Sequence, residues 1–182
     1  MRLGELLSVK VSCDRINVTI ADMTIAPSLP PGLILRRARP DEIWTLRKKV
    51  LLAALDPTQF DPSRFWVGEA EGKVVACGQL RPFGPVLELG SLVVDRPWRG
   101  RGVGSAIVDR LIDQADRPLY LECLGENLPK FYRRFGFVEV SWADLPPSLQ
   151  GNVRLRMSHW GRQWLGVPVT FMRYAGVPGP TD

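Results

Sequence analysis

The chain has 182 residues, of which 45% are hydrophobic and 24% are charged, a balance typical of a globular domain of ordinary core size. No apolar stretch approaches the ~20 residues that a membrane-spanning helix needs, and the N-terminus lacks a secretory signal pattern, so we expect no membrane partner and a cytoplasmic location. The formal net charge of +5 suits an anionic ligand or nucleic acid, but no nucleic-acid-binding motif supports the second. Three widely spaced cysteines and one histidine argue against a metal site.

The N-terminal part of the chain differs in composition from the rest. Residues 1–32 hold two short alternating segments, and three prolines and a glycine between residues 27 and 32 then break regular structure. We therefore predict an N-terminal extension and linker over residues 1–32, one domain over residues 33–174 and a C-terminal tail over residues 175–182.

Within residues 33–174 the periodicity predicts a mixture of helices and strands. Apolar side chains recur at helical spacing after Pro40 and again after Gly104, whereas the stretches between them alternate or run continuously apolar, as strands do. A tight hairpin is predicted at residues 71–72. In chain order we expect a strand at 33–37, a helix from Pro40 to Ala54, strands at 65–71, 73–81 and 86–94, a helix after a glycine-rich loop, a strand at 118–123, a helix at 128–135, a strand at 137–141, a partly helical segment at 144–166 and a strand at 167–174.

The glycine-rich loop after the predicted strand 86–94 is the most informative segment. Residues 99–104 read Arg-Gly-Arg-Gly-Val-Gly and open an amphipathic helix, so orphan backbone N–H groups and the helix dipole would form an anion site. The dinucleotide fingerprint does not fit, because its third glycine would fall on Ser105 or Ile107. The P-loop does not fit either, because Gly104 is followed by Ser-Ala rather than by Lys-Ser or Lys-Thr.

The pattern that remains, Arg99-x-x-Gly102-x-Gly104, resembles the pyrophosphate loop of the GNAT superfamily of acyl-CoA-dependent N-acetyltransferases. The alternative is a plain connector, for which three glycines in five positions would be entropically costly. The resemblance implies an α/β (α+β) GNAT fold with a mixed sheet of about six to seven strands flanked by helices. It also implies a splay between strands 86–94 and 118–123, and acetyl-CoA as co-substrate.

The resemblance further implies which residues hold CoA. The backbone of Leu92, Val93 and Val94 would pair with the pantetheine arm as an extra strand would. The same side chains would also serve as ordinary core residues, and the two interpretations are compatible because the family binds through the main chain. The implied pyrophosphate ligands are the backbone N–H groups of Arg99, Gly100, Arg101, Gly102, Val103, Gly104 and Ser105.

A second motif, Phe-Tyr-Arg-Arg-Phe-Gly-Phe at residues 131–137, resembles the family's Phe/Leu-Tyr-x-x-x-Gly-Phe block. The resemblance makes Tyr132 the acid that protonates the departing CoA thiolate, a useful donor because a thiol has a pKa of about 8.5. The alternative is a tyrosine that only packs on an amphipathic helix. The family's CoA-contacting asparagine would stand at Gly125, so either Asn127 substitutes for it from two residues away or that contact is missing.

The amine acceptor must lose a proton before it attacks, which favours a carboxylate base. Glu88 lies on the central strand, eleven positions before Arg99, a spacing at which some lysine-acetylating family members place a glutamate base. Strict alternation puts Glu88 on the same face as Leu92 and Val94, where an apolar environment would favour proton uptake. The alternatives are a Glu88 in water near the strand end or paired with an arginine, and Glu122 on the next strand is the reserve candidate.

Together these residues predict an N-acetyltransferase that moves an acetyl group from acetyl-CoA to a primary amine by direct attack in a ternary complex, with a homodimer allowed. Two other function classes stay open at this point: a GNAT-fold module that binds acyl-CoA without transfer, and a basic nucleic-acid-associated protein. The acceptor is left open among a small amine, a protein N-terminus and a lysine side chain. We expect it to be set by the loops at 55–65 and 81–86 and by the segment 142–166.

Overall fold

The computed structural model describes residues 29–53, 55–56, 59–152, 155 and 168–176. Most of the predicted C-terminal tail, nearly all of the predicted N-terminal extension and part of the segment 144–166 therefore lie outside the described residues. The predicted hairpin is confirmed, since Glu71 and Gly72 both adopt positive φ, at 50° and 72°, as a tight turn between twisted strands requires.

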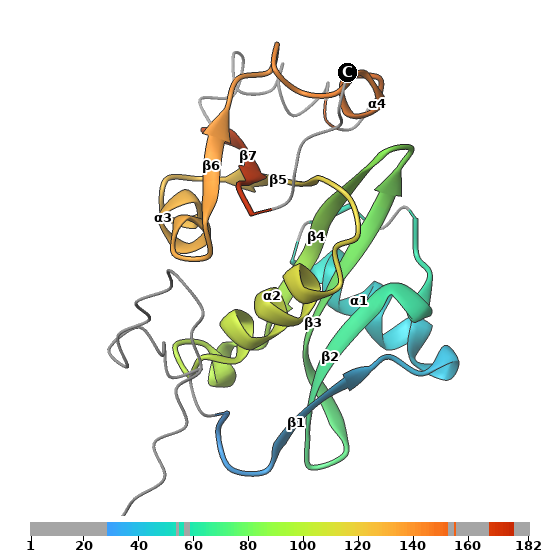
Figure 1. Cartoon of the computed structure of the whole chain (residues 1–182). Coiled ribbons are helices and arrows are strands. Elements are labelled where there is room, and N and C mark those ends of the chain that lie inside the picture. Colours follow the sequence, from blue (N-terminus) through green and yellow to red (C-terminus); the bar gives the residue numbers. More distant parts are fainter. Residues whose placement is uncertain (1–28, 54, 57–58, 153–154, 156–167, 177–182) are drawn as a thin grey trace, which may run out of the picture.

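A seven-stranded mixed sheet runs through the molecule in the order β1-β2-β3-β4-β5-β7-β6 (Figure 1). Of the strand pairs in this sheet, β4 and β5 are parallel and the other five pairs are antiparallel. The strands are β1 (Leu33–Arg37), β2 (Phe65–Ala70), β3 (Lys73–Phe83), β4 (Val86–Val94), β5 (Leu119–Leu124), β6 (Phe137–Val140) and β7 (Val169–Tyr174). The helices are α1 (Ile43–Leu52), α2 (Val103–Asp113), α3 (Asn127–Arg133) and α4 (Pro147–Gln150).

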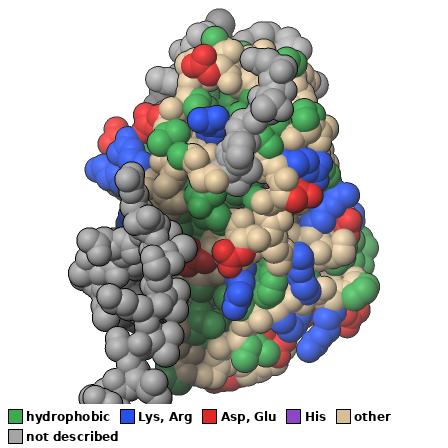
Figure 2. Space-filling model, in the orientation of Figure 1, with side chains coloured by type: hydrophobic (Ala, Val, Ile, Leu, Met, Phe, Trp, Pro, Cys, Tyr) green, Lys and Arg blue, Asp and Glu red, His purple; other side chains and the backbone are tan. Residues whose placement is uncertain are grey.

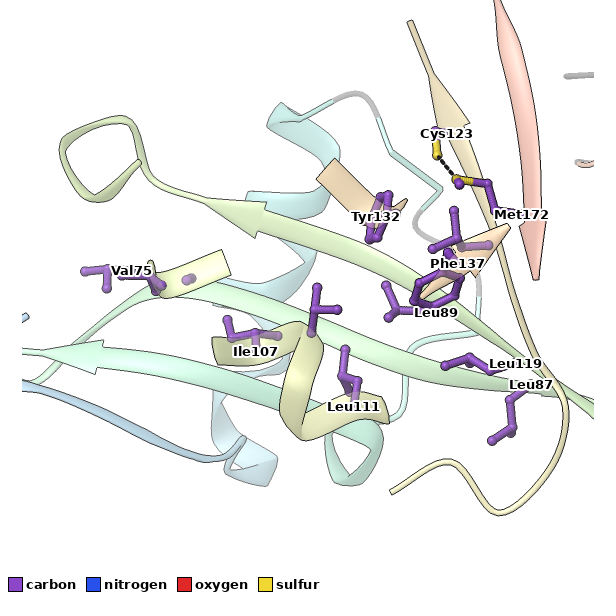
Figure 3. Packing of buried hydrophobic residues seen from close by; sticks show 14 of the residues in the cluster. Val75, Leu87, Leu89, Ile107, Leu111, Leu119, Cys123, Tyr132, Phe137 and Met172 are labelled. Atoms are coloured by element: carbon purple, nitrogen blue, oxygen red, sulfur yellow. Dashed lines mark hydrogen bonds between the residues drawn. The ribbon is translucent and has the colours of Figure 1, made fainter. Parts of the chain in front are cut away.

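Helices cover both faces of the sheet. Ile107 and Leu111 of α2 pack with Leu87 and Leu89 of β4 in the main core cluster (Figure 3), and Tyr132 of α3 belongs to the same cluster. A second cluster joins α1 to the opposite face through its buried residues Leu46 and Val50. Full burial of each such aliphatic side chain contributes about 1.5–3 kcal/mol, so both faces of the central strands are firmly held.

A β-bulge interrupts β4 in its middle. Cys77 of β3 pairs with Val93, and Gln79 pairs with Gly90, so β4 has one more residue than β3 between these two pairs. The extra residue is Ser91, whose φ of 54° lies in the left-handed region that non-glycine residues rarely adopt. The bulge shifts the alternation of side chains by one position from there to the end of the strand.

The two parallel strands diverge just before this bulge. β4 pairs with β5 only from Leu87 to Leu89, opposite Leu119–Leu121. Beyond these residues β5 keeps only its pairing with β7 on its other edge, whereas β4 continues beside β3. The predicted splay between the two strands is thus confirmed, and it leaves the bulged half of β4 without a strand neighbour on its β5 side.

Candidate active site

A cleft of about 800 Å³ opens beside the bulged half of β4. Its size falls within the range of about 300–1,000 Å³ that small-molecule sites occupy. The end of β4, the loop before α2, the first turn of α2, helix α3 and the residues after α1 all contribute to its walls. The lining residues are Ala53, Leu55, Leu92, Val93, Val94, Trp98, Arg99, Gly100, Gly102, Gly104, Ser105, Asn127, Leu128, Phe131 and Arg134.

The N-terminus of α2 faces this cleft through residues without bulky side chains. Gly100 and Gly102 have φ of 72° and 79°, so the chain turns tightly into the helix in a conformation that suits glycine. Gly104 sits in the first turn, where a Cβ would lie 3.4 Å from Val94 Cγ2. The first N–H groups of a helix have no acceptor within it and carry partial positive charge. The geometry is that of an anion site open to the cleft.

The arginines and the valine of the loop have different surroundings. Arg99 Nε donates to the carbonyl of Val94 at 2.8 Å, which ties the loop to the end of β4. The Arg101 guanidinium lies 5.7 Å from the Trp98 ring centre, and Val103 is buried in the main core cluster. Arg101 and Val103 do not line the cleft, so only their backbone N–H groups remain candidates for contact with a ligand there.

The other nine residues predicted to bind the donor all line this single cleft, including Asn127, for which the sequence left two alternatives. Sequence reasoning missed Leu55, which approaches from beyond α1, and Phe131 and Arg134 on the α3 side. Phe131 and Arg134 both lie within the second motif, which the sequence had already assigned to the donor site, so the sequence did contain a signal that they contribute to the cleft. Leu55 gave no such signal.

Tyr132 lies beneath the cleft rather than in its wall. Its side chain is 6% exposed, makes an edge contact with Phe131 and another with Phe137, and clusters with Leu89 and Cys123 where β4 and β5 diverge (Figure 3). Burial raises the pKa of the Tyr132 hydroxyl above its ordinary value, and the Cys123 thiol adds to the effect. The hydroxyl is therefore protonated at neutral pH and able to donate a hydrogen bond.

The expectation that Glu88 shares a face with Leu92 and Val94 is wrong. Leu92 and Val94 pack with Leu87 and Leu89 in the cluster beneath α2, because the bulge at Ser91 shifts the alternation by one residue. Glu88 stands between Leu87 and Leu89 and so points to the other face. A carboxylate on that face is separated from the pyrophosphate loop by the thickness of the sheet.

Glu88 is also not at a water-exposed strand end. It is 3% exposed, and its Oε2 lies 3.5 Å from Nη1 of Arg81, its direct partner across β3 and β4. The alternative of an arginine-paired Glu88 is therefore the one that the structure bears out. Glu122, the reserve candidate, lies two residues after Tyr120, the partner of Glu88 on β5, and so shares its face.

Residues 34–137 match the model of the family described as the Acetyltransferase (GNAT) family. The chain belongs to this family. A curated relative, the amino-acid acetyltransferase of Mycobacterium tuberculosis (strain ATCC 25618 / H37Rv), is 34% identical over 121 residues, and the match covers 59% of this chain and 69% of the relative.

Solved structures show the same GNAT fold. A Mycobacterium tuberculosis protein crystallised with CoA superposes with a TM-score of 0.62 at 23% identity, over 77% of this chain and 97% of the other. The N-acetylglutamate synthase of Neisseria gonorrhoeae, in complex with coenzyme A and N-acetyl-glutamate, gives a TM-score of 0.57 at 18% identity. That match covers 78% of this chain but only 35% of the Neisseria chain.

As a GNAT acetyltransferase, the protein uses acetyl-CoA as donor and an amine as acceptor. The described residues hold no group of three or more side chains that could bind a metal ion. No helix in the described part of the chain is long and apolar enough to cross a membrane. On the face shown in Figure 2, basic and acidic side chains are interspersed, whereas a nucleic-acid-binding surface gathers its basic side chains into a patch or stripe.

Proposed function

We propose that this GNAT enzyme acetylates the amine of a free amino acid. The observation that carries the proposal is the 34% identity to a relative named amino-acid acetyltransferase, over 69% of that relative's length. The structure supports the assignment with a buried polar cluster around Glu88, on the sheet face that the donor loop leaves free. On this proposal the acceptor amine reaches the thioester from that side.

On this proposal acetyl-CoA lies along the cleft, with its pyrophosphate at the first turn of α2 and its pantetheine arm beside Leu92, Val93 and Val94. The missing strand neighbour of the bulged half of β4 supports this placement, because strand backbone without a partner can pair with an extended ligand. The carbonyl of Val94 already accepts from Arg99 Nε at 2.8 Å, so we assign the pantetheine contacts mainly to Leu92 and Val93. Asn127 and Arg134 would close the opposite wall.

The proposed reaction is direct acyl transfer in a ternary complex. Glu88 takes a proton from the amine, the amine nitrogen forms a bond to the thioester carbon, and the carbon–sulfur bond breaks to release the CoA thiolate. Strand N–H groups polarise the carbonyl oxygen as negative charge develops on it. The hydroxyl of Tyr132 donates a hydrogen bond to the departing sulfur.

The raised pKa of Tyr132 sets a condition on this last step. A thiol has a pKa of about 8.5, below that of the buried phenol, so full proton transfer from Tyr132 to the thiolate is uphill. We therefore propose that the main contribution of Tyr132 is a hydrogen bond to the departing sulfur, and that the thiolate takes its proton from solvent as CoA leaves. Tyr132→Phe should lower kcat and leave the Kd of acetyl-CoA nearly unchanged.

Three further proposals rest on the sequence. Residues 33–174 form the catalytic domain, between an extension at residues 1–32 and a tail at residues 175–182. The protein acts in the cytoplasm without a membrane or nucleic-acid partner, and two copies of it can form a homodimer. Glu122 serves as base only if Glu88 does not.

The acceptor proposal is tested by following CoA release with a thiol reagent for each standard amino acid and for its amide. The two forms offer similar amines, but the amide lacks the α-carboxylate, so the pair isolates recognition of a free amino acid. We expect at least one amino acid to react faster than its amide, than N-terminal peptides and than lysine side chains in N-terminally blocked peptides. Preference for a peptide or a simple amine would overturn the acceptor assignment, and absence of acetyl-CoA binding in calorimetry would overturn the donor site.

A further inference from the structure

All four polar side chains that are buried in the described part of the chain lie at one place. They are Gln79, Arg81, Glu88 and Ser91, each at most 5% exposed, on facing positions of β3 and β4 around the bulge. Burial of polar and charged groups is costly unless they are well paired. Such a cluster next to a catalytic cleft is a candidate for function rather than for stability.

The Arg81 guanidinium connects the members of this cluster. Nη2 donates to Ser91 Oγ at 2.6 Å and to the carbonyl of Asp56 at 3.2 Å. Nη1 donates to Asp56 Oδ2 at 3.4 Å and lies 3.5 Å from Glu88 Oε2. Nε lies 3.0 Å from the Gln79 side chain when the amide oxygen faces it, the orientation that suits an arginine, which only donates. Protein acceptors thus surround the guanidinium on every side.

The backbone of β4 is shaped around this guanidinium. A Cβ at Gly90 would lie only 3.1 Å from Arg81 Cζ, so glycine allows the planar group to lie against the strand. Ser91 holds its left-handed φ of 54° while its hydroxyl accepts from Arg81. Strained backbone of this kind persists where the surroundings hold it in place, and here Arg81 does so.

We propose that Arg81 is a positioning residue that orients the Glu88 carboxylate for proton abstraction and ties it to the bulge and to Asp56 beyond α1. The inference rests on the proposed role of Glu88 as base. Arg81 does not act as a ligand for the acceptor, because its donors already have protein partners that an incoming carboxylate would have to displace. Other ionisable groups on this face include Asp56, Tyr120 and Glu122, with Arg173 bonded to Tyr120. Cys77 of β3 also lies there, close to Ser91, and the Lys49–Asp95 ion pair acts on it.

The test compares Arg81→Met and Arg81→Lys with Arg36→Met. Arg36 is a matched control because it also bridges two carboxylates, Glu42 and Glu69, at the β1 edge of the sheet away from the cleft. The readouts are kcat/KM for the best acceptor across about pH 5 to 10 and the Kd of acetyl-CoA from calorimetry.

In Arg81→Met, the Glu88 carboxylate loses the guanidinium that lies 3.5 Å from it and orients it, so we expect kcat/KM to fall by about tenfold or more and the shape of its pH profile to change. We expect kcat to fall and the Kd of acetyl-CoA to stay within about twofold. Arg81→Lys should restore part of the profile, because it keeps the charge but not the planar fork. Arg36→Met should lower Tm and leave the profile in place.

A folded Arg81→Met with the wild-type profile and kcat would overturn the inference, as would an equal change in Arg36→Met. Should Arg81→Met not fold, Gly90→Ala displaces the guanidinium and keeps its charge, and we expect kcat to fall by about tenfold or more with unchanged acetyl-CoA affinity. Glu88→Gln separates the two proposals. Wild-type activity in Glu88→Gln removes the base assignment itself, whereas loss of the acidic limb in Glu88→Gln together with a wild-type profile and kcat in Arg81→Met removes only the positioning role.

Discussion

A side chain at Gly104 should affect stability and donor binding in opposite directions. A Cβ there would meet Val94 Cγ2 at 3.4 Å and Phe131 Cζ at 3.9 Å, which are ordinary van der Waals contacts, and Gly104 is not among the glycines with positive φ. Alanine therefore fits and removes the entropic cost of glycine in a helix. Gly104→Ala should raise the free energy of unfolding by about 0.5–1 kcal/mol, which corresponds to about 1–4 °C in Tm.

Valine at the same position adds two methyl groups beside the N–H groups that face the cleft. Loss of one hydrogen bond to a charged acceptor costs about 1.5–3 kcal/mol, so Gly104→Val should weaken acetyl-CoA binding by about 10- to 150-fold. Calorimetry gives the Kd and thermal unfolding gives Tm. Ala106→Val is the control, because Ala106 lies in α2 but does not line the cleft. Wild-type affinity in Gly104→Val, or an equal loss in Ala106→Val, would refute the placement of the pyrophosphate.

Three further outcomes are expected. Arg134 lines the cleft, whereas its neighbour Arg133 pairs with Glu139. Arg134→Ala should therefore raise the KM for acetyl-CoA severalfold, and the control Arg133→Ala should not. Equal KM values in the two variants would remove Arg134 from the donor site. The hydrogen bond from Arg36 lowers the pKa of Glu42 in the folded protein, so the stability that Glu42 contributes is present above its unfolded pKa and is lost as pH falls through the folded one. Denaturant unfolding of Glu42→Gln should therefore show a deficit near neutral pH that shrinks in acid, and a constant deficit would contradict this. Burial raises the pKa of the Cys77 and Cys123 thiols to about 12. Iodoacetamide at about pH 8 should therefore leave both thiols unmodified until the protein is unfolded, as site-resolved mass spectrometry can show. Rapid labelling of either cysteine in the native protein would contradict its burial.

The donor half of the site could be predicted because its information is local. The glycine loop and the Tyr132 motif are each contiguous, and main-chain contacts depend on backbone geometry that glycine spacing reveals. Arg101 and Val103 lie outside the cleft lining because a segment of consecutive residues cannot turn every side chain to the same side. The sequence named a loop that does line the cleft, but it could not say which of its side chains point away.

The acceptor half could not be predicted in the same way, because it depends on a β-bulge and on contacts between distant segments. A single extra residue at Ser91 moves every later side chain of the strand to the other face of the sheet. Because Ser91 is not a glycine, the sequence does not indicate that its φ is positive. Arg81 meets Asp56 and Glu88 only after three separate segments have assembled. Arginine pairing with Glu88 was an open alternative, but nothing in the sequence singled out Arg81.

The bulge explains how one strand can serve both substrates. Without it, strict alternation would place Ser91 and Val93 beneath α2 and turn Leu92 and Val94 toward α1. With it, Leu92 and Val94 pack on the α2 side, where the donor loop lies, while the Ser91 hydroxyl joins Arg81 on the Glu88 side. On the proposed mechanism, an acceptor amine that enters beside Glu88 would approach the thioester from the face opposite the donor loop. The amine would then reach the carbonyl carbon from one face of the sheet while the thiolate departs along the cleft on the other.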